Sequence, residues 1–308
     1  MIPSARSTTL AALLLLTTGA TAGAQRVVGR DDVSWSTREQ LSSGDRLRIA
    51  SPNGPITITQ GTGAEVEIRA EKTAEQGASI DDIGFIVKRA AGGLVVCAVY
   101  DDDDECDMER GYRTGARRSR DGWRNRARAS FTVRIPRGVL VQAETGNGAI
   151  AITGAGSEVR VVTGNGGVLV SGTTGRVEAT TGNGRVTVED ASGPVEATTG
   201  NGDVRVTTSN GPVTARSGNG NIDVTMARVE RAAAMNFSTG IGRITVGVPE
   251  GFGAEMDASS GHGDVTSDVP LRIEGRPHRR HLRGTLGEGG ERLTLSTGNG
   301  DIAIRRAR

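Results

Sequence analysis

One stretch decides the fold: Val177-Glu-Ala-Thr-Thr-Gly-Asn-Gly-Arg-Val-Thr-Val188. Its central Thr-Gly-Asn-Gly, or a close variant, returns at a fixed interval over residues 145–220. The asparagines of this motif are each 18 residues from the next: Asn147, Asn165, Asn183, Asn201 and Asn219. A constant period of this length is typical of a solenoid, in which each repeat forms one coil.

The pattern within one repeat predicts two short strands separated by tight corners. Small apolar and polar residues alternate on both sides of the Gly-Asn-Gly, which is the period of a strand with one buried face. The β-branched residues favour strands, and the glycines supply the positive φ angles of a tight turn. A second corner is marked by Gly156, Gly175, Gly193 and Gly211. We therefore expect an all-β fold, a parallel β-helix with coils of roughly 18 residues.

Residues one period apart are expected to lie directly above one another, about 4.8 Å apart. The inward positions then form columns of small side chains: Val159, Val177, Val195 and Val213; Val161, Ala179, Ala197 and Ala215; Thr163, Thr181, Thr199 and Ser217; Ile150, Val168, Val186, Val204 and Ile222. A core this thin agrees with an aromatic content of only 3%. On the outside the same register pairs opposite charges: Arg185 with Asp203, Arg205 with Asp223, and Arg160 with Glu178. A solvated face is the favoured interpretation, and a ligand groove is the alternative.

The repeated asparagines allow three interpretations. In the first they are structural, either stacking their amides in a ladder or tolerating a left-handed corner conformation. In the second they belong to a calcium-binding β-roll, but the residue after Gly-Asn-Gly is acidic in only one of the five repeats, at Asp203. In the third, threonines such as Thr181 form an ice-facing array, but their parity points inward. We expect the structural role, with no metal or cofactor bound.

The first 24 residues have the pattern of a secretory signal peptide. Arg6 precedes a short apolar run, and Ala22-Gly-Ala24 offers small residues for cleavage before Gln25. The run is too short to span a bilayer, and no later apolar stretch approaches that length, so no transmembrane segment is expected. We expect an exported chain that is periplasmic, cell-surface or extracellular.

The rest of the chain is expected to form one β-solenoid domain at 45–308, preceded by a capping segment at 25–44. Terminal coils need a cap, and Trp35 is the candidate plug. A charged loop insertion at about 100–128 interrupts the coils. After residue 219 the repeat loosens, because Thr239-Gly-Ile-Gly242 and Ser260-Gly-His-Gly263 replace the motif. The last strand segment, Leu293-Thr-Leu-Ser-Thr-Gly-Asn-Gly-Asp-Ile-Ala-Ile304, restores the full motif and is expected to close the fold.

The only two cysteines, Cys97 and Cys106, flank the start of this insertion. In an exported protein a pair this close is most simply a disulfide that closes a short loop. The acidic run at 101–105 could supply oxygen ligands to calcium, but it lacks EF-hand spacing. A solvated loop is therefore the favoured interpretation of the run.

An arginine-rich segment follows the acidic run directly. Adjacent blocks of opposite charge usually neutralise each other in a loop, which is the favoured interpretation. The segment is still the best candidate for contact with an anionic surface such as lipopolysaccharide, an acidic polysaccharide or nucleic acid. The residues proposed for that contact are Arg117, Arg118, Arg120, Arg124 and Arg126. Because the formal net charge is only +1, we do not expect a dedicated nucleic-acid binder.

Several segments resemble a bacterial family of exported β-strand-repeat proteins, which are described as candidate adhesins with a domain of unknown function. They are Val133-Arg-Ile-Pro-Arg-Gly-Val139 leading into Thr145-Gly-Asn-Gly148, the recurring Gly-Asn-Gly-x-Val-x-Val, and Arg283-Gly-Thr-Leu-Gly-Glu-Gly-Gly-Glu-Arg-Leu-Thr-Leu295. The resemblance covers roughly residues 45–305. It implies an exported parallel β-helix, right-handed, and it brings no catalytic residues.

The sequence is compatible with three functions. Export, repetition and the lack of recognisable chemistry favour a non-enzymatic, adhesin-like protein that binds a glycan, an envelope component or a protein. A polysaccharide lyase or hydrolase would need clustered carboxylates, which the mixed columns around Asp203 and Asp223 do not provide. A periplasmic scaffold that assembles end to end is the third. The sequence contains no nucleophile elbow, nucleotide loop or zinc spacing, so we expect no catalytic or cofactor-binding residues.

Overall fold

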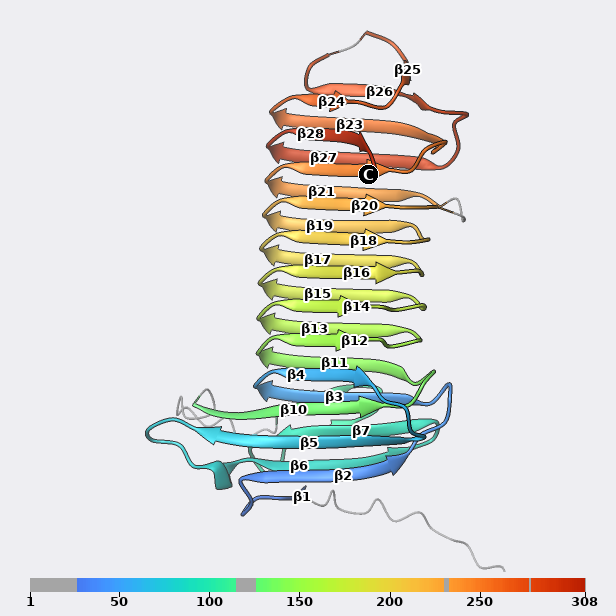
Figure 1. Ribbon diagram of the computed structural model, residues 1–308. Helices are drawn as coiled ribbons and strands as arrows, with labels where there is room; N and C mark the ends of the chain where they lie inside the picture. Colours follow the sequence, from blue (N-terminus) through green and yellow to red (C-terminus); the bar gives the residue numbers. More distant parts are fainter. Residues whose placement is uncertain (1–26, 115–125, 230–232, 277, 308) are drawn as a thin grey trace, which may run out of the picture.

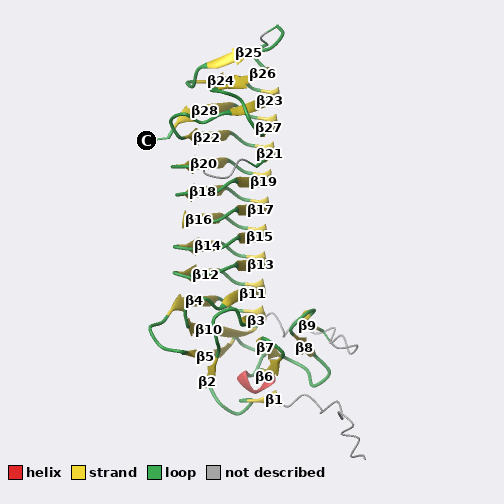
Figure 2. Cartoon of the chain, turned by 90° about the vertical axis from the view of Figure 1, so that its right-hand side faces the viewer, coloured by secondary structure: helices red, strands yellow, loops and turns green. Residues whose placement is uncertain are grey.

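The computed structural model shows a tall, narrow stack of strands on a wider base (Figure 1). It describes residues 27–114, 126–229, 233–276 and 278–307, so the signal peptide predicted at 1–24 lies outside the described residues. Two long sheets face each other along the stack and are joined at every level by corners (Figure 2). Within the described ranges helical structure is limited to the 3-10 turn η1 (Ile80–Asp82), and none of it could cross a bilayer.

Two sheets and one hairpin contain the strands. The first sheet runs in spatial order through β1 (Val27–Val28), β6 (Gly84–Ala90), β7 (Gly93–Val99), β3 (Arg46–Asn53), β11 (Leu140–Asn147), β13 (Val159–Asn165), β15 (Val177–Asn183), β17 (Val195–Asn201), β19 (Val213–Asn219), β21 (Met235–Ile241), β27 (Arg292–Asn299), β23 (Ala254–His262), β26 (His281–Leu286) and β25 (Leu271–Ile273). The second runs through β2 (Ser34–Gln40), β5 (Glu65–Ala74), β10 (Ala127–Ile135), β4 (Ile56–Gln60), β12 (Ile150–Thr153), β14 (Val168–Ser171), β16 (Val186–Ala191), β18 (Val204–Thr208), β20 (Ile222–Met226), β22 (Ile244–Val248), β28 (Ile302–Arg306) and β24 (Val265–Ser267). The hairpin joins β8 (Glu105–Asp107) to β9 (Gly111–Arg113).

The coils from β11 to β20 follow the predicted period. Their strands run parallel, and residues one period apart are paired across neighbouring levels, as Val177 is with Val195 and Val186 with Val204. The side chains predicted to point inward are buried, Ala179 among them. The all-β solenoid is therefore confirmed, and its core is a thin layer of small side chains between the two sheets.

Two departures from chain order bring distant segments into this stack. The coil of β3 and β4 lies directly below β11 and β12, and Asn53 pairs with Asn147 although β5 to β10 separate them in the sequence. At the other end β27 and β28 fit between the coil of β21 and β22 and that of β23 and β24. The last strand, expected to close the fold, instead fills an internal level, because its corner motif matches the register on both sides.

The base, which consists of β1, β2 and β5 to β10, departs from the parallel coils expected throughout 45–308. Here β5 runs antiparallel to both β2 and β10, and β6 runs antiparallel to β7. Gly92, with a φ of +75°, allows a tight turn between β6 and β7, and such a turn joins antiparallel neighbours. Aromatic rings fill the interior: the Trp35 ring is stacked with its centroid 5.0 Å from that of Phe85, which meets Phe131 edge-on at 5.7 Å.

Candidate functional site

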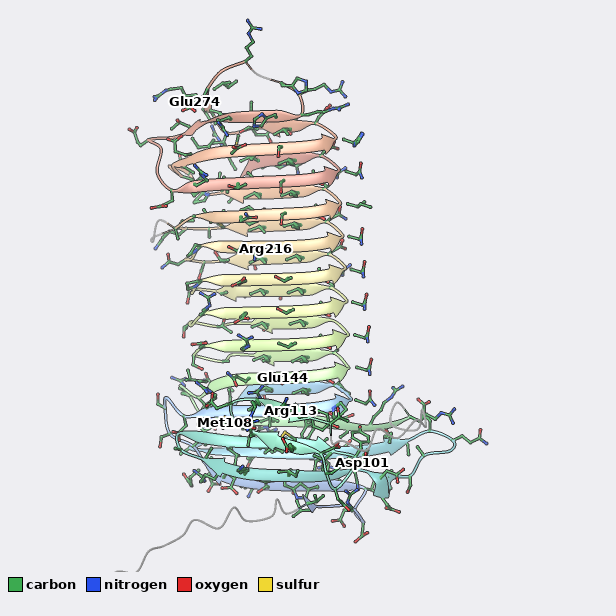
Figure 3. The ribbon with its side chains drawn as sticks, turned by 180° about the vertical axis from the view of Figure 1, so that it is seen from behind. Asp101, Met108, Arg113, Glu144, Arg216 and Glu274 are labelled. Atoms are coloured by element: carbon green, nitrogen blue, oxygen red, sulfur yellow. A yellow bond between two sulfur atoms is a disulfide. The ribbon has the colours of Figure 1, made fainter. Side chains whose placement is uncertain are left out.

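The corner asparagines form a ladder of amide hydrogen bonds along one edge of the stack, where side chains project in register (Figure 3). In each step the Nδ2 of one asparagine donates to the Oδ1 of the asparagine one level below, at 2.7 to 2.9 Å. This amide ladder comprises Asn53, Asn147, Asn165, Asn183, Asn201 and Asn219. Where a corner of the ladder has a positive φ, it belongs to the glycine after the asparagine, as in Gly184 at +149°, and not to the asparagine.

The threonines that precede the corners point inward, as their parity predicted. The hydroxyl of Thr163 donates to the carbonyl of Gly148 at 2.9 Å, and that of Thr181 donates to the carbonyl of Gly166 at the same distance. Because these side chains are buried and their hydroxyls are bonded within the protein, they cannot present an ice-facing array.

A shallow hollow of about 600 Å³ lies on the outer face of the second sheet, over the levels of β16 to β28. We call this surface the charged hollow. Its charged side chains are Arg185, Asp203, Arg205, Asp223, Arg243 and Asp301. Uncharged residues from the corner, including Ile241 and Asn299, form its edge. The hollow therefore offers donors, acceptors and one apolar group on a rigid surface.

Opposite charges alternate along the charged hollow. The distances between guanidinium nitrogen and carboxylate oxygen are 3.4 Å for Arg185 with Asp203, 3.9 Å for Arg205 with Asp223 and 3.9 Å for Arg243 with Asp301. The first two pairs follow from the repeat, whereas the third depends on the inserted level of β28 and was not predicted. Exposed pairs of this kind contribute only about 0–1 kcal/mol to stability, so their groups can exchange partners with a ligand.

Asp203 also caps the backbone of the level above it. Its Oδ1 accepts a hydrogen bond from the backbone N–H of Asn221 at 2.9 Å, and the Oδ1 of Asn221 in turn accepts one from the N–H of Arg243 at 2.9 Å. The bond from Asn221, aided by the charge of Arg185, holds the pKa of Asp203 below its ordinary value. Asp203 is therefore an anion at neutral pH, able to accept hydrogen bonds but unsuited to act as a general acid.

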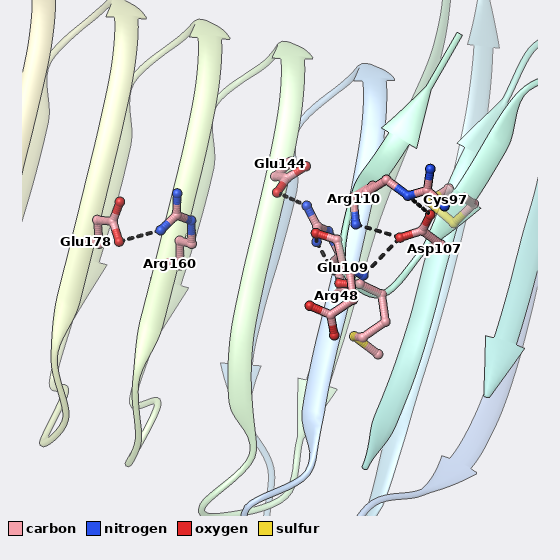
Figure 4. A network of polar contacts seen from close by, with 10 residues as sticks. Arg48, Cys97, Asp107, Glu109, Arg110, Glu144, Arg160 and Glu178 are labelled. Carbon is pink, nitrogen blue, oxygen red and sulfur yellow. Dashed lines mark hydrogen bonds and ion pairs between the residues drawn. A yellow bond between two sulfur atoms is a disulfide. The ribbon is translucent and has the colours of Figure 1, made fainter. Parts of the chain in front are cut away.

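A disulfide-linked arm, residues 97–113, crosses the lowest coils on the first sheet. The disulfide joins Cys97 of β7 to Cys106 of β8. Arg48 donates to the backbone carbonyl of Met108 at 2.7 Å and forms an ion pair with Glu144 of β11 (Figure 4). Because the Arg48 side chain is buried, this contact fastens the arm to the stack.

The acidic run at 101–105 folds into a compact loop around Asp104. The Oδ2 of Asp104 accepts hydrogen bonds from the backbone N–H of Asp101 at 3.0 Å and from the hydroxyl of Tyr112 at 2.9 Å. Asp104 is buried, which the solvated-loop interpretation did not anticipate. Carboxylate oxygens of Asp101, Asp103 and Asp104 lie within 4.8 Å of one another. The buried carboxylate serves donors of the loop itself, so it has a structural role.

Most of the arginines proposed for contact with an anionic surface lie outside the described residues: Arg117, Arg118, Arg120 and Arg124. Arg126 is described, and its guanidinium donates to the carbonyl of Gln76 at 3.2 Å. Its neighbour Arg128 forms an ion pair with Glu75 at 3.0 Å. Neutralisation was expected from the acidic run, but for Arg128 it comes from Glu75, directly after β5.

A cluster that sequence reasoning missed lies near the upper end of the stack. The antiparallel register of β23 and β26 brings His281 Nε2 to 3.0 Å from Asp257 Oδ1, and Arg283 bonds the other oxygen of the same carboxylate. The hydrogen bond from Arg283 holds the pKa of Asp257 below its ordinary value. Nothing in the sequence pairs these residues, because the connection between the strands is irregular.

Residues 44–305 match the profile of the family described as Toastrack DUF4097. Similar solved structures include a candidate adhesin from Parabacteroides distasonis, with 10% identity, a TM-score of 0.46 and coverage of 88% of this chain and 96% of that one. A candidate lipid-binding protein from the same organism has 12% identity, a TM-score of 0.46 and coverage of 87% and 96%. A candidate adhesin from Bacteroides fragilis has 14% identity, a TM-score of 0.37 and coverage of 88% and 96%. No curated protein matches the sequence.

Proposed function

Because the chain belongs to the Toastrack DUF4097 family, we propose that it is an exported, adhesin-like β-solenoid that binds a glycan and performs no catalysis. Export is supported by the pattern of residues 1–24 and by the disulfide between Cys97 and Cys106, since disulfides persist in oxidising compartments. Binding is supported by the hydrogen-bond donors and acceptors of the charged hollow. Catalysis is disfavoured by its carboxylates, which lie beside arginines.

The observation that carries the proposal is the alternation of three arginines and three aspartates over the charged hollow. These planar groups are rich in hydrogen-bond donors and acceptors, yet their charges cancel. Successive levels lie about 4.8 Å apart on a rigid scaffold, so an extended polymer can contact several of them at once. Multiple weak contacts of this kind add up to a useful affinity.

An enzymatic role is disfavoured by the state of the carboxylates. Hydrolysis of a glycosidic bond needs one carboxyl group that holds a proton near neutral pH. In the charged hollow Asp203 is instead stabilised as an anion by Asn221 and Arg185. Each of the other two carboxylates, Asp223 and Asp301, has an arginine as its neighbour.

End-to-end assembly is disfavoured by the two ends of the stack. At the upper end the first sheet ends in the antiparallel pair β26 and β25, whereas the second sheet ends in the three-residue parallel strand β24. At the lower end β1 and β2 pair antiparallel with the strands inside them. A second copy could therefore not continue the parallel coil across both sheets at either end. Very short terminal strands, such as β24 and β25, are a common protection against edge-to-edge pairing.

The test measures binding of the purified chain to immobilised bacterial polysaccharides, both neutral and acidic. The triple variant Arg185→Ala, Arg205→Ala, Arg243→Ala is expected to lose at least about tenfold in affinity, or 1.4 kcal/mol. Arg160→Ala is the matched control, because Arg160 forms a similar exposed pair with Glu178, at 2.6 Å, on the other sheet. Failure of the wild-type chain to bind any glycan, or release of new reducing ends from one, would overturn the proposal.

A further inference from the structure

The amide ladder stops at one place within the stack. Above Asn219 the next level is β21, which puts Ile241 in the corner position, and Asn299 of β27 occupies the same position one level higher. An isoleucine side chain can neither donate nor accept a hydrogen bond. The Oδ1 of Asn219 therefore cannot receive the bond that the lower asparagines receive, and Asn299 cannot donate one downward.

The backbone does not require this interruption. Ile241 pairs in register with the asparagines below and above it, and the glycine after it, Gly242, has a φ of +149°, against +151° for Gly220 and +147° for Gly300. The corner therefore has the same shape at all three levels. An asparagine would fit at residue 241 and would continue the ladder, so the isoleucine is a change of side chain alone.

The interruption of the amide ladder lies beside the charged hollow. The side chain of Ile241 is 55% exposed, and together with Asn299 it forms one edge of the hollow. An apolar surface thus lies between two amide groups that are two levels, or about 9.6 Å, apart. The charges of the hollow cancel, because each of its three arginines has an aspartate neighbour.

We propose that this gap in the ladder is a subsite for one pyranose ring of a neutral polysaccharide. A pyranose has an apolar face of C–H groups and a rim of hydroxyls, which both donate and accept hydrogen bonds. Its face packs on Ile241, while hydroxyls bond Oδ1 of Asn219 and Nδ2 of Asn299. Neighbouring rings extend over Arg243 and Asp301. Pockets that take small ligands combine an apolar floor with a few placed polar groups in this way.

This inference rests on the proposed function and names its ligand class and its central residue. A hollow without net charge gains little from an anionic polymer, so acidic polysaccharides are expected to bind more weakly than neutral ones. The arginine-rich segment at 110–128, by contrast, would favour the acidic polymer. The preference for neutral or acidic polymer therefore separates the two surfaces.

The experiment compares the full chain with Ile241→Asn for binding to neutral glucan and mannan and to an acidic uronic polymer. The substitution completes the ladder, so the melting temperature is expected to stay equal or rise, whereas affinity for the neutral polymer falls about tenfold, or 1.4 kcal/mol. Leu169→Asn is the matched control, because Leu169 is also exposed, at 38%, on the second sheet, away from the charged hollow. That variant is expected to bind like the wild-type chain.

Unchanged binding by Ile241→Asn, together with lost binding by the triple arginine variant, would overturn the subsite and leave the proposed function intact. Preference of the wild-type chain for the acidic polymer would overturn the ligand class. Binding to none of the polymers would overturn the proposed function itself, and the subsite with it.

Discussion

The coils of β11 to β20 and those of β21 to β24, with the inserted β27 and β28, share one backbone register but differ in their corners. In the lower group every corner holds an asparagine, and the chain fills the levels in sequence order. In the upper group Ile241, Asn299 and His262 occupy successive corners, and the last strands fill an internal level. The register survives both changes, because inward residues and corner glycines set it in both groups.

The difference between the two groups of coils shows which positions of a corner tolerate a change of side chain. A glycine of the corner meets the backbone of the level below, and the inward threonine bonds to a carbonyl there, so these positions are constrained. The corner side chain next to them points to solvent and costs little to exchange. The upper coils use that freedom, and the charged hollow with its apolar edge lies there.

The largest expected effect tests whether the two groups of coils share one corner geometry. A Cβ on Gly184 would lie 2.2 Å from the carbonyl oxygen of Gly166, and one on Gly242 would lie 2.1 Å from that of Gly220. Both Gly184→Ala and Gly242→Ala are expected to lower the free energy of unfolding by roughly 2–5 kcal/mol, from strain and overpacking. Urea unfolding measures this.

The control lies in the same corner region. A Cβ on Gly167 would lie 3.6 Å from its nearest neighbour, an ordinary contact, so Gly167→Ala is expected to be nearly neutral. If Gly242→Ala were as mild as this control while Gly184→Ala was severe, the upper coils would not share the register of the lower ones.

The second effect concerns the base, which is held by a covalent link that the coils lack. Replacing Cys97 and Cys106 by serine is expected to cost about 2–3 kcal/mol, because a short loop is no longer closed. Hydrogen exchange should accelerate in β6 to β9 and stay unchanged in β13 to β19. Equal acceleration in both regions would show that the base and the stack unfold as one unit.

The regular coils could be predicted from the sequence because the period fixes the register. Once Asn147 and Asn165 are aligned, every inward column follows, as does the ion pair of Arg185 with Asp203. The base could not be predicted, because its strands carry the same alternation whether they pair in parallel or antiparallel. Local alternation reveals a strand but not its neighbour.

The candidate site could be predicted only in part. The loss of asparagine at Ile241 is visible in the sequence, and so are the charges of Arg185, Asp203 and Arg205. The other edge of the site, Asn299 with Asp301, comes from a level that enters the stack out of order. Asn53-Gly54 resembles the later corners in the sequence, but its level could not be predicted, because its distance from Asn147 is not a multiple of the period.

The third effect compares the amide ladder with its gap. Asn183→Ala removes two hydrogen bonds, one to Asn165 and one from Asn201, and water can replace both at this exposed edge. The expected cost is about 0.5–1.5 kcal/mol in the free energy of unfolding. Ile241→Asn is the opposite change, and thermal unfolding should show equal or higher stability. If Ile241→Asn lowered the free energy of unfolding as much as Asn183→Ala does, the gap in the ladder would itself stabilise the fold.

The smallest effect is a pH dependence at the boundary between the two groups. The pKa of Asp203 is lower in the folded chain than in the unfolded one, because the backbone N–H of Asn221 bonds its anion. The contribution of ionised Asp203 to the free energy of unfolding is therefore present above the unfolded pKa of about 3.9. It is lost as the pH falls through the folded pKa.

Asp203→Asn should accordingly have a lower free energy of unfolding than the wild-type chain at pH 7, and urea titrations should show this difference shrinking as the pH falls below about 4. Asn221→Ala keeps the backbone N–H that is the main cause of the shift, so it should retain most of the acid dependence. A difference between Asp203→Asn and wild type that stays constant down to pH 2 would mean that this carboxylate does not couple the levels of β18 and β20.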